Sequence, residues 1–157
     1  MAEASSIGVL HAMIPSGTVA EFNFFLPSVV AIVPQVVDAL ISRITSLRVR
    51  DGSEDDIELA FQEALLNAVI HGNKEDPFKR VSVTLRCGAD GEVRIRIQDE
   101  GAGFEVASVP DPTTPEHLRA KHGRGIYLMR TLMDEVSFGD GGTVVHMRKG
   151  ASVTPRQ

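Results

Sequence analysis

Hydrophobic and polar positions alternate in several parts of the chain, and this spacing predicts strands. Residues 18–26 alternate roughly, and residues 80–87 and 92–99 alternate regularly, as expected for strands with one buried face. The Gly-Ala-Asp-Gly sequence between the last two runs is a turn signal, so they should form a β-hairpin. A second hairpin is expected over residues 135–149, turned at Gly-Asp-Gly-Gly.

Other segments have the spacing of helices. Residues 34–47 place apolar side chains along one face, which predicts an amphipathic helix. A second helix is expected over residues 54–71, where Ser53 can cap its start and Gly72 can end it. Residues 123–133 are expected to form a glycine-rich turn that opens a short third helix.

The order of these elements predicts an α+β fold. Strand, two helices, two strands, a loop, a helix and two strands favour a two-layer α/β sandwich. Its sheet should be mixed and largely antiparallel, with the helices on one face. We expect one domain over residues 17–150, preceded by a loosely ordered segment at 1–16 and followed by a tail at 151–157. The loop between residues 103 and 123 is short and proline-rich.

Composition narrows the class of protein. The chain has 157 residues, 43% of them hydrophobic and 24% charged, which is typical of a soluble globular domain. Its net charge of -5 argues against broad nucleic-acid binding. The single cysteine, Cys87, excludes an internal disulfide framework and is expected to be a packed thiol. No secretory signal or membrane span is visible, so we expect a cytoplasmic protein with no membrane contact.

The second predicted helix contains polar residues where a core is expected. From Leu59 to Ile70, nine of twelve residues are apolar, yet Glu63 and Asn67 interrupt the run. Residues four apart share a helix face, so these two and His71 should form one polar ridge. A buried carboxylate needs compensation. Two interpretations are open: the ridge borders a wet cleft, cation or charged ligand, or Glu63 forms a salt bridge and Asn67 bonds to backbone.

Three further motifs are weak signals when taken singly. Asp99 opens the sequence Asp-Glu-Gly-Ala-Gly-Phe at the end of a strand, where glycines allow a flat ligand to approach the backbone. Gly123 and Gly125 stand at the expected helix start, where free amides can bind phosphate. Thr143 begins the last strand. Each of these is also compatible with an ordinary turn.

Taken in order, the motifs E-x-x-x-N, D-x-G-x-G, G-x-G and G-T resemble the N, G1, G2 and G3 boxes of the histidine-kinase-like ATPases, the GHKL or Bergerat fold. The resemblance covers roughly residues 18–149. Within that superfamily, Leu-Met-Arg-Thr-Leu-Met-Asp-Glu-Val at 128–136 is most similar to the anti-sigma-factor serine/threonine kinases.

This resemblance implies roles for individual residues. It makes Glu63 the general base, Asn67 the ligand of Mg²⁺ and Asp99 the acceptor for the adenine amino group of ATP. The adenine pocket is implied to include Gly101, Gly103 and Thr143. The phosphates are implied to lie against Gly123, Arg124, Gly125 and Ile126. His71 is expected to be a pocket-wall or helix C-terminal histidine.

The function implied by the resemblance is an Mg²⁺-ATP-dependent protein kinase. It would phosphorylate an anti-sigma-factor antagonist protein and regulate a sigma factor, as a homodimer and without direct contact to nucleic acid. Two alternatives stay open. One is an ATP- or ADP-binding regulatory switch without kinase activity, and the other is a stand-alone ATP-binding domain of a histidine-kinase-like system.

Overall fold

The computed structural model describes residues 17–47, 52–105 and 121–151. The expected N-terminal segment, most of the proline-rich loop and nearly all of the tail lie outside these ranges. Within the described ranges, the order of strands and helices agrees with the order predicted from the sequence.

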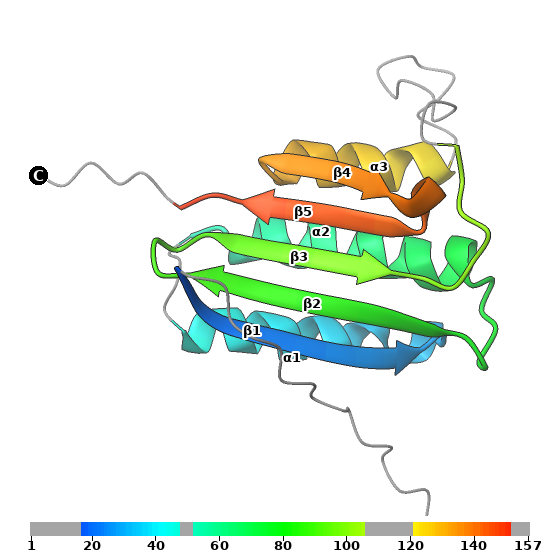
Figure 1. Ribbon diagram of the computed structural model, residues 1–157, viewed down its shortest axis with the longest axis horizontal. Coiled ribbons are helices and arrows are strands. Elements are labelled where there is room, and N and C mark those ends of the chain that lie inside the picture. Colours follow the sequence, from blue (N-terminus) through cyan, green and yellow to red (C-terminus); the bar gives the residue numbers. More distant parts are fainter. Residues whose placement is uncertain (1–16, 48–51, 106–120, 152–157) are drawn as a thin grey trace, which may run out of the picture.

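Five strands form one sheet, in the spatial order β1-β2-β3-β5-β4 (Figure 1). The strands are β1 Thr18–Pro27, β2 Arg80–Gly88, β3 Val93–Gln98, β4 Glu135–Gly139 and β5 Val144–Lys149. Each neighbouring pair is antiparallel, so the predicted sandwich with a largely antiparallel sheet is confirmed, and the described strands include no parallel pair. Two helices separate β1 from β2 and return the chain to the end where β1 finished, so β2 must run the opposite way.

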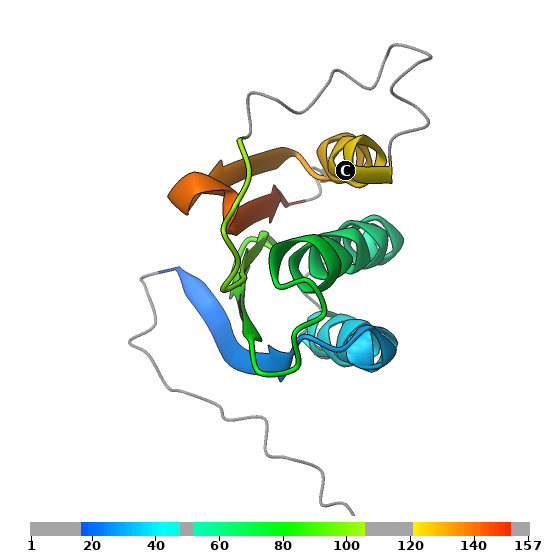
Figure 2. The same ribbon diagram turned by 90° about the vertical axis from the view of Figure 1, so that its right-hand side faces the viewer.

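Three α-helices cover one face of this sheet. α1 spans Val33–Ser46 after a short 3₁₀ turn, η1, at Val30–Ile32, and α2 spans Glu54–Leu66. α3 spans Lys121–Leu132. Figure 2 shows the three helices on the same side, with α2 between α1 and α3. The apolar positions of the strands alternate toward these helices, and the core lies between the two layers.

Local signals explain where the helices begin, with two differences from expectation. Pro34 stands in the first turn of α1, where its missing N–H is not needed. Ser53 occupies the N-cap position of α2, but its side chain makes no capping hydrogen bond. α3 begins two residues earlier than the expected turn, so Gly123 and Gly125 lie inside its first turns. Glycine weakens a helix interior, and close packing of α3 on α2 compensates for it here.

Cys87 is fully buried in β2, and burial raises the pKa of its thiol to about 11. The expectation of a packed thiol is therefore confirmed. Across residues 17–47, 52–105 and 121–151, no helix has the length and apolar content needed to cross a membrane.

Candidate functional site

The helix that carries the polar ridge changes its geometry at the ridge. α2 ends at Leu66 and continues as a π-helix, η2, over Asn67–Gly72. The wider turn is visible at its end, where the N–H of Asn73 donates to the carbonyl of Ala68, five residues back, at 2.8 Å. Short π-helical segments within helices often occur at functional sites. The sequence predicted the whole helix correctly but not this change of pitch.

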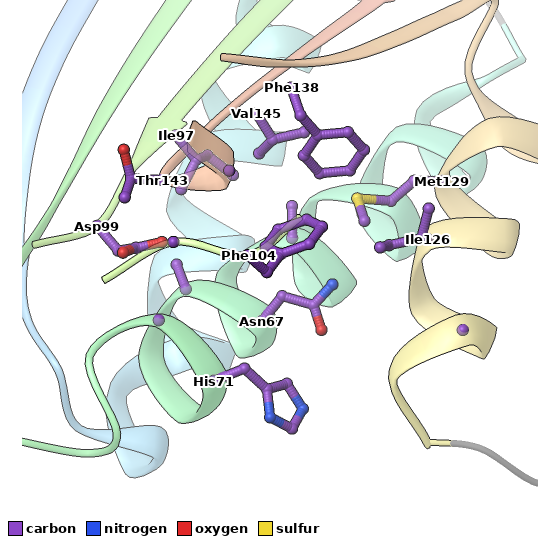
Figure 3. A pocket seen from close by; sticks show the side chains of 16 residues that line it. Asn67, His71, Ile97, Asp99, Phe104, Ile126, Met129, Phe138, Thr143 and Val145 are labelled. Carbon is purple, nitrogen blue, oxygen red and sulfur yellow. The ribbon is translucent and has the colours of Figure 1, made fainter. Parts of the chain in front are cut away.

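A cavity of about 320 Å³ lies over η2, between the end of β3, α3 and the β4–β5 hairpin. That volume is at the lower end of the range of small-molecule pockets. In Figure 3, Asn67 and His71 project from one helical stretch, with Asp99 and Thr143 on one side and Ile126 and Met129 on the other. Six of the ten predicted site residues line this cavity: Asn67, Asp99, Gly103, Gly123, Ile126 and Thr143. The expectation that His71 is a pocket-wall residue is confirmed.

Most of the wall is apolar. It is formed by core-facing side chains of the sheet and of α3, namely Ile97, Phe138, Val145, Ile126 and Met129. Phe104 completes it, with its ring 5.4 Å from that of Phe138 in an edge-to-face contact at 75°. The wall is therefore suited to a flat apolar ring rather than to an open chain of charges.

Asp99 is the charged group of the cavity, and it is held by several contacts. Its N–H donates to the carbonyl of Thr143 at 3.0 Å, and its Oδ1 accepts from the N–H of Gly101 at 2.8 Å. Burial raises the pKa of the Asp99 carboxyl, while the Gly101 N–H and the charge of Lys79 oppose that rise. A partly desolvated carboxylate in an apolar pocket is a strong acceptor for a ligand N–H.

Glycines let the surrounding backbones approach this carboxylate. A Cβ on Gly72 would lie 2.4 Å from Cγ of Asp99, and one on Gly101 would lie 2.1 Å from the carbonyl oxygen of Gly72. Gly103 has a φ of +77°, and a Cβ there would lie 2.1 Å from the carbonyl oxygen of Gly141. Both glycines of the Asp-x-Gly-x-Gly motif are thus required by packing. Gly101 itself does not line the cavity and acts through these contacts.

Thr143 connects the loop after β3 to the second hairpin. Its hydroxyl donates to the carbonyl of Asp140 at 3.0 Å, within the 3₁₀ turn η4 at Asp140–Gly142. Its backbone carbonyl accepts the hydrogen bond from the N–H of Asp99. Its hydroxyl oxygen keeps lone pairs that can accept a hydrogen bond, so Thr143 can contribute to a polar network beside Asp99.

Glu63 and Asn67 meet α3 at Gly125. A Cβ on Gly125 would lie 2.9 Å from Oε2 of Glu63 and 3.5 Å from Oδ1 of Asn67. Both side chains are half-buried. In the part of the chain that the structure describes, neither has a side-chain hydrogen bond or ion pair. The salt bridge that would have made Glu63 structural is therefore not present among these residues.

Glu63, Arg124 and Gly125 do not themselves line the cavity. Gly125 packs against Glu63 and Asn67, and Arg124 is exposed on α3. No group of three or more His, Cys, Asp or Glu within the described ranges could hold a metal ion. A cation at Asn67 would thus take most of its ligands from a bound ligand and water, a pattern that Mg²⁺ tolerates well.

A model of the histidine kinase-like ATPase domain matches residues 26–149, which include β2 to β5 and all three α-helices. The chain belongs to this family. The cavity, with Asp99 at one side and Asn67 at the other, lies within the matched residues.

The domain is similar in sequence to proteins named as anti-sigma factors and as serine-protein kinases. An anti-sigma F factor of Heyndrickxia coagulans is 40% identical over 94 residues, or 55% of this chain and 63% of that protein. The serine-protein kinase RsbW of Bacillus subtilis (strain 168) is 37% identical over 103 residues, or 60% of this chain and 63% of that protein. The chain thus spans less than two thirds of the length of either relative.

The fold of the domain is also found in a solved histidine kinase. The histidine kinase domain from the Erythrobacter litoralis EL346 blue-light activated histidine kinase superposes with a TM-score of 0.50 at 19% identity, over 81% of this chain and 62% of that chain. This likeness confirms the two-layer architecture that the sequence predicted.

Several lining residues of the histidine kinase-like ATPase domain were missed by sequence reasoning. Phe104 directly follows the second glycine of its motif, and an aromatic residue there was a signal that could have been used. Phe138 and Met129 were indistinguishable from ordinary core positions of a strand and a helix. Only the sheet order, which places β5 beside β3, brings Phe138 over the cavity.

Proposed function

We propose that this protein is an Mg²⁺-ATP-dependent serine/threonine protein kinase of the anti-sigma-factor type. It phosphorylates an anti-sigma-factor antagonist protein and regulates a sigma factor. The single observation that carries the enzymatic part is the pair Glu63 and Asn67, half-buried where α2 and η2 meet α3 at Gly125, with Asn67 lining the cavity and neither having a side-chain partner in the described ranges. The names of the similar proteins support the choice of substrate and partner.

The cavity fits the adenine end of ATP. Asp99 accepts a hydrogen bond from the adenine amino group, while Gly101 and Gly103 allow the backbone to approach the ring and Thr143 supports the polar network. The apolar wall, including Phe104 and Phe138, excludes water from the ring.

The other end of the cavity fits the phosphates. Gly123 and Ile126 line it, and Arg124 and Gly125 lie beside them in the first turns of α3, whose positive dipole end favours negative charge. The amide oxygen of Asn67 would hold Mg²⁺, which would neutralise charge on the phosphates.

Glu63 is the general base of the proposed transfer. Its carboxylate accepts the proton of the substrate serine or threonine hydroxyl. The hydroxyl oxygen forms a bond to the γ-phosphorus, the bond from that phosphorus to the β–γ bridging oxygen breaks, and ADP leaves. As a regulator of a sigma factor, the protein is expected to work in the cytoplasm, and we propose that it does so as a homodimer.

The experiment is phosphoryl transfer from γ-labelled ATP to a candidate antagonist, with Glu63→Gln as the diagnostic variant. The variant keeps the size of the side chain and loses its basicity, so transfer should fall at least about 100-fold while ATP affinity changes little. Gln62→Glu, at the exposed neighbouring position, is a matched control and should transfer normally. If the wild-type protein binds ATP but transfers nothing to any candidate, it is a nucleotide-binding switch and not a kinase.

A further inference from the structure

Asn73 is a fully buried polar residue that lies outside the cavity. It follows η2 directly, and its side chain is 0% exposed. Its Nδ2 donates to Oγ of Ser28 at 2.6 Å and to the carbonyl of Arg80 at 2.9 Å. Its Oδ1 accepts from the N–H of Glu100 at 2.7 Å. A buried amide is stable only when so bonded, and it then fixes its partners in place.

These bonds join three separate parts of the chain to the end of η2. Ser28 lies between β1 and η1 and is itself fully buried, and Arg80 begins β2. Glu100 belongs to the loop after β3, and its carboxylate also accepts from the N–H of Arg80. The loop that carries Asp99 is therefore held against β2 and η2 by the buried Asn73 side chain, and the Glu100 carboxylate adds a second bond to β2.

The bond to Glu100 bears directly on Asp99. The Glu100 N–H belongs to the peptide group that follows Asp99, while the N–H of Asp99 itself is held by Thr143. The Asp99 backbone is thus fixed on both sides. Gly72, the residue before Asn73, leaves the space that the Asp99 carboxylate fills. Gly72 and Asn73 thus act together: Asn73 holds the loop in place, and Gly72 leaves room for the Asp99 carboxylate.

We infer that Asn73 is a positioning residue for nucleobase selection: through Glu100 it sets the position of Asp99 and so the preference for a base with an amino group. The inference rests on the proposed function, in which Asp99 accepts a hydrogen bond from adenine. Asn73 does not line the cavity, so its effect is exerted through Asp99.

The test measures dissociation constants for Mg²⁺-ATP and Mg²⁺-ITP by calorimetry, in full-length variants shown to be folded by circular dichroism. Inosine carries an oxygen in place of the adenine amino group, so the ratio of the two constants reports the Asp99 contact. Asn73→Ala should lower the preference for ATP by about tenfold, the value of one hydrogen bond to a charged group. Ser28→Ala removes a different bond of Asn73 and should keep the ratio within about twofold, although both variants lower the melting temperature.

A second pair of variants covers the case in which Asn73→Ala does not fold. Glu100→Pro removes the backbone N–H that donates a hydrogen bond to Oδ1 of Asn73, and it leaves the other two hydrogen bonds of Asn73 in place. Glu100→Ala removes the same side chain but keeps that N–H. The proline variant should lose the preference for ATP, and the alanine variant should retain it.

The outcomes separate this inference from the proposed function. A wild-type ratio in Asn73→Ala or, if that variant is unfolded, in Glu100→Pro overturns the role of Asn73 and leaves the proposed function standing. A loss in Ser28→Ala as large as in Asn73→Ala also overturns it, because general loosening would then be the cause. Absence of ATP binding in the wild type, or an unchanged ratio in Asp99→Asn, refutes the proposed function, and the inference falls with it.

Discussion

At the scale of single residues, Asp99 shows how a binding group can reduce the stability of the protein that carries it. The carboxyl is half-buried, and burial raises its pKa, although the Gly101 N–H and Lys79 partly compensate. The ionised form of Asp99 is therefore less favourable in the folded protein than in the unfolded chain. In the proposed function, this cost is offset by the hydrogen bond that Asp99 accepts from the ligand.

Asp99→Asn tests this directly. The amide oxygen can still accept from the Gly101 N–H, so the ligand-free variant should melt at the same temperature as the wild type or higher. Its affinity for ATP should fall about 10- to 100-fold, because a charge-assisted hydrogen bond is lost. Thermal melting and calorimetry measure both quantities. A lower melting temperature with unchanged ATP affinity would make Asp99 a structural residue.

The same residue predicts a dependence of stability on pH. Since the folded pKa of Asp99 is raised above its usual value of 3.8, the folded protein binds its proton more tightly than the unfolded chain does. The contribution of Asp99 to the free energy of unfolding should therefore decrease as the pH rises from 3.8 through the raised pKa. The difference between wild type and Asp99→Asn, measured by urea unfolding across that range, isolates it. An increase with pH would contradict the raised pKa.

Residues with local partners were predictable, and residues with distant partners were not. Glu63 and Asn67 are four positions apart on one helix, so their common face followed from helical geometry alone. Asn73 gave no such signal, because its partners Ser28 and Glu100 are 45 and 27 positions away in the sequence. No periodicity or turn rule places such residues together. The role of Asn73 could only be seen once the fold had brought them into contact.

At the scale of elements, the strands and helices followed from hydrophobic spacing, but their contacts did not. The π-helical turn at Asn67–Gly72 has the same apolar pattern as an α-helix and differs only in which carbonyl accepts each N–H. The position of β5 between β3 and β4 likewise depends on which strand edges meet. Both features shape the cavity, so the sequence predicted its residues better than its form.

The approach of α3 to α2 gives a prediction at this scale. Gly125→Ala should stabilise α3 by up to about 1 kcal/mol through helix propensity. Its Cβ would, however, lie 2.9 Å from Oε2 of Glu63, so the carboxylate must move. Displacing a reacting group by about 1 Å can reduce turnover about 100-fold. We expect phosphoryl transfer to fall steeply, with a smaller change in ATP affinity.

Arg130→Ala is the control for this variant, since Arg130 is exposed on the same helix. It should transfer phosphate at nearly the wild-type rate. Normal transfer by Gly125→Ala would contradict the assignment of Glu63 as the general base, because a displaced base should transfer phosphate slowly.

At the scale of the whole molecule, the cavity is bordered by elements from both halves of the chain. α2 and η2 come from the first half, and α3 with the β4–β5 hairpin comes from the second. A ligand that contacts both sets binds only the folded protein, so it should raise the temperature of global unfolding. The size of that rise depends on the ligand concentration relative to its dissociation constant.

Mg²⁺-ATP at 100 times its dissociation constant should stabilise the fold by about 2.7 kcal/mol. For a domain of this size that corresponds to a rise of about 5–10 °C in melting temperature. Glu63→Gln should show the same rise as the wild type, because a general base acts in transfer and not in binding. Asp99→Asn, tested at the same ATP concentration, should show a much smaller one. A rise in melting temperature in the wild type that is absent in Glu63→Gln would mean that Glu63 binds the nucleotide. The assignment of Asp99 to binding and of Glu63 to phosphoryl transfer would then be wrong.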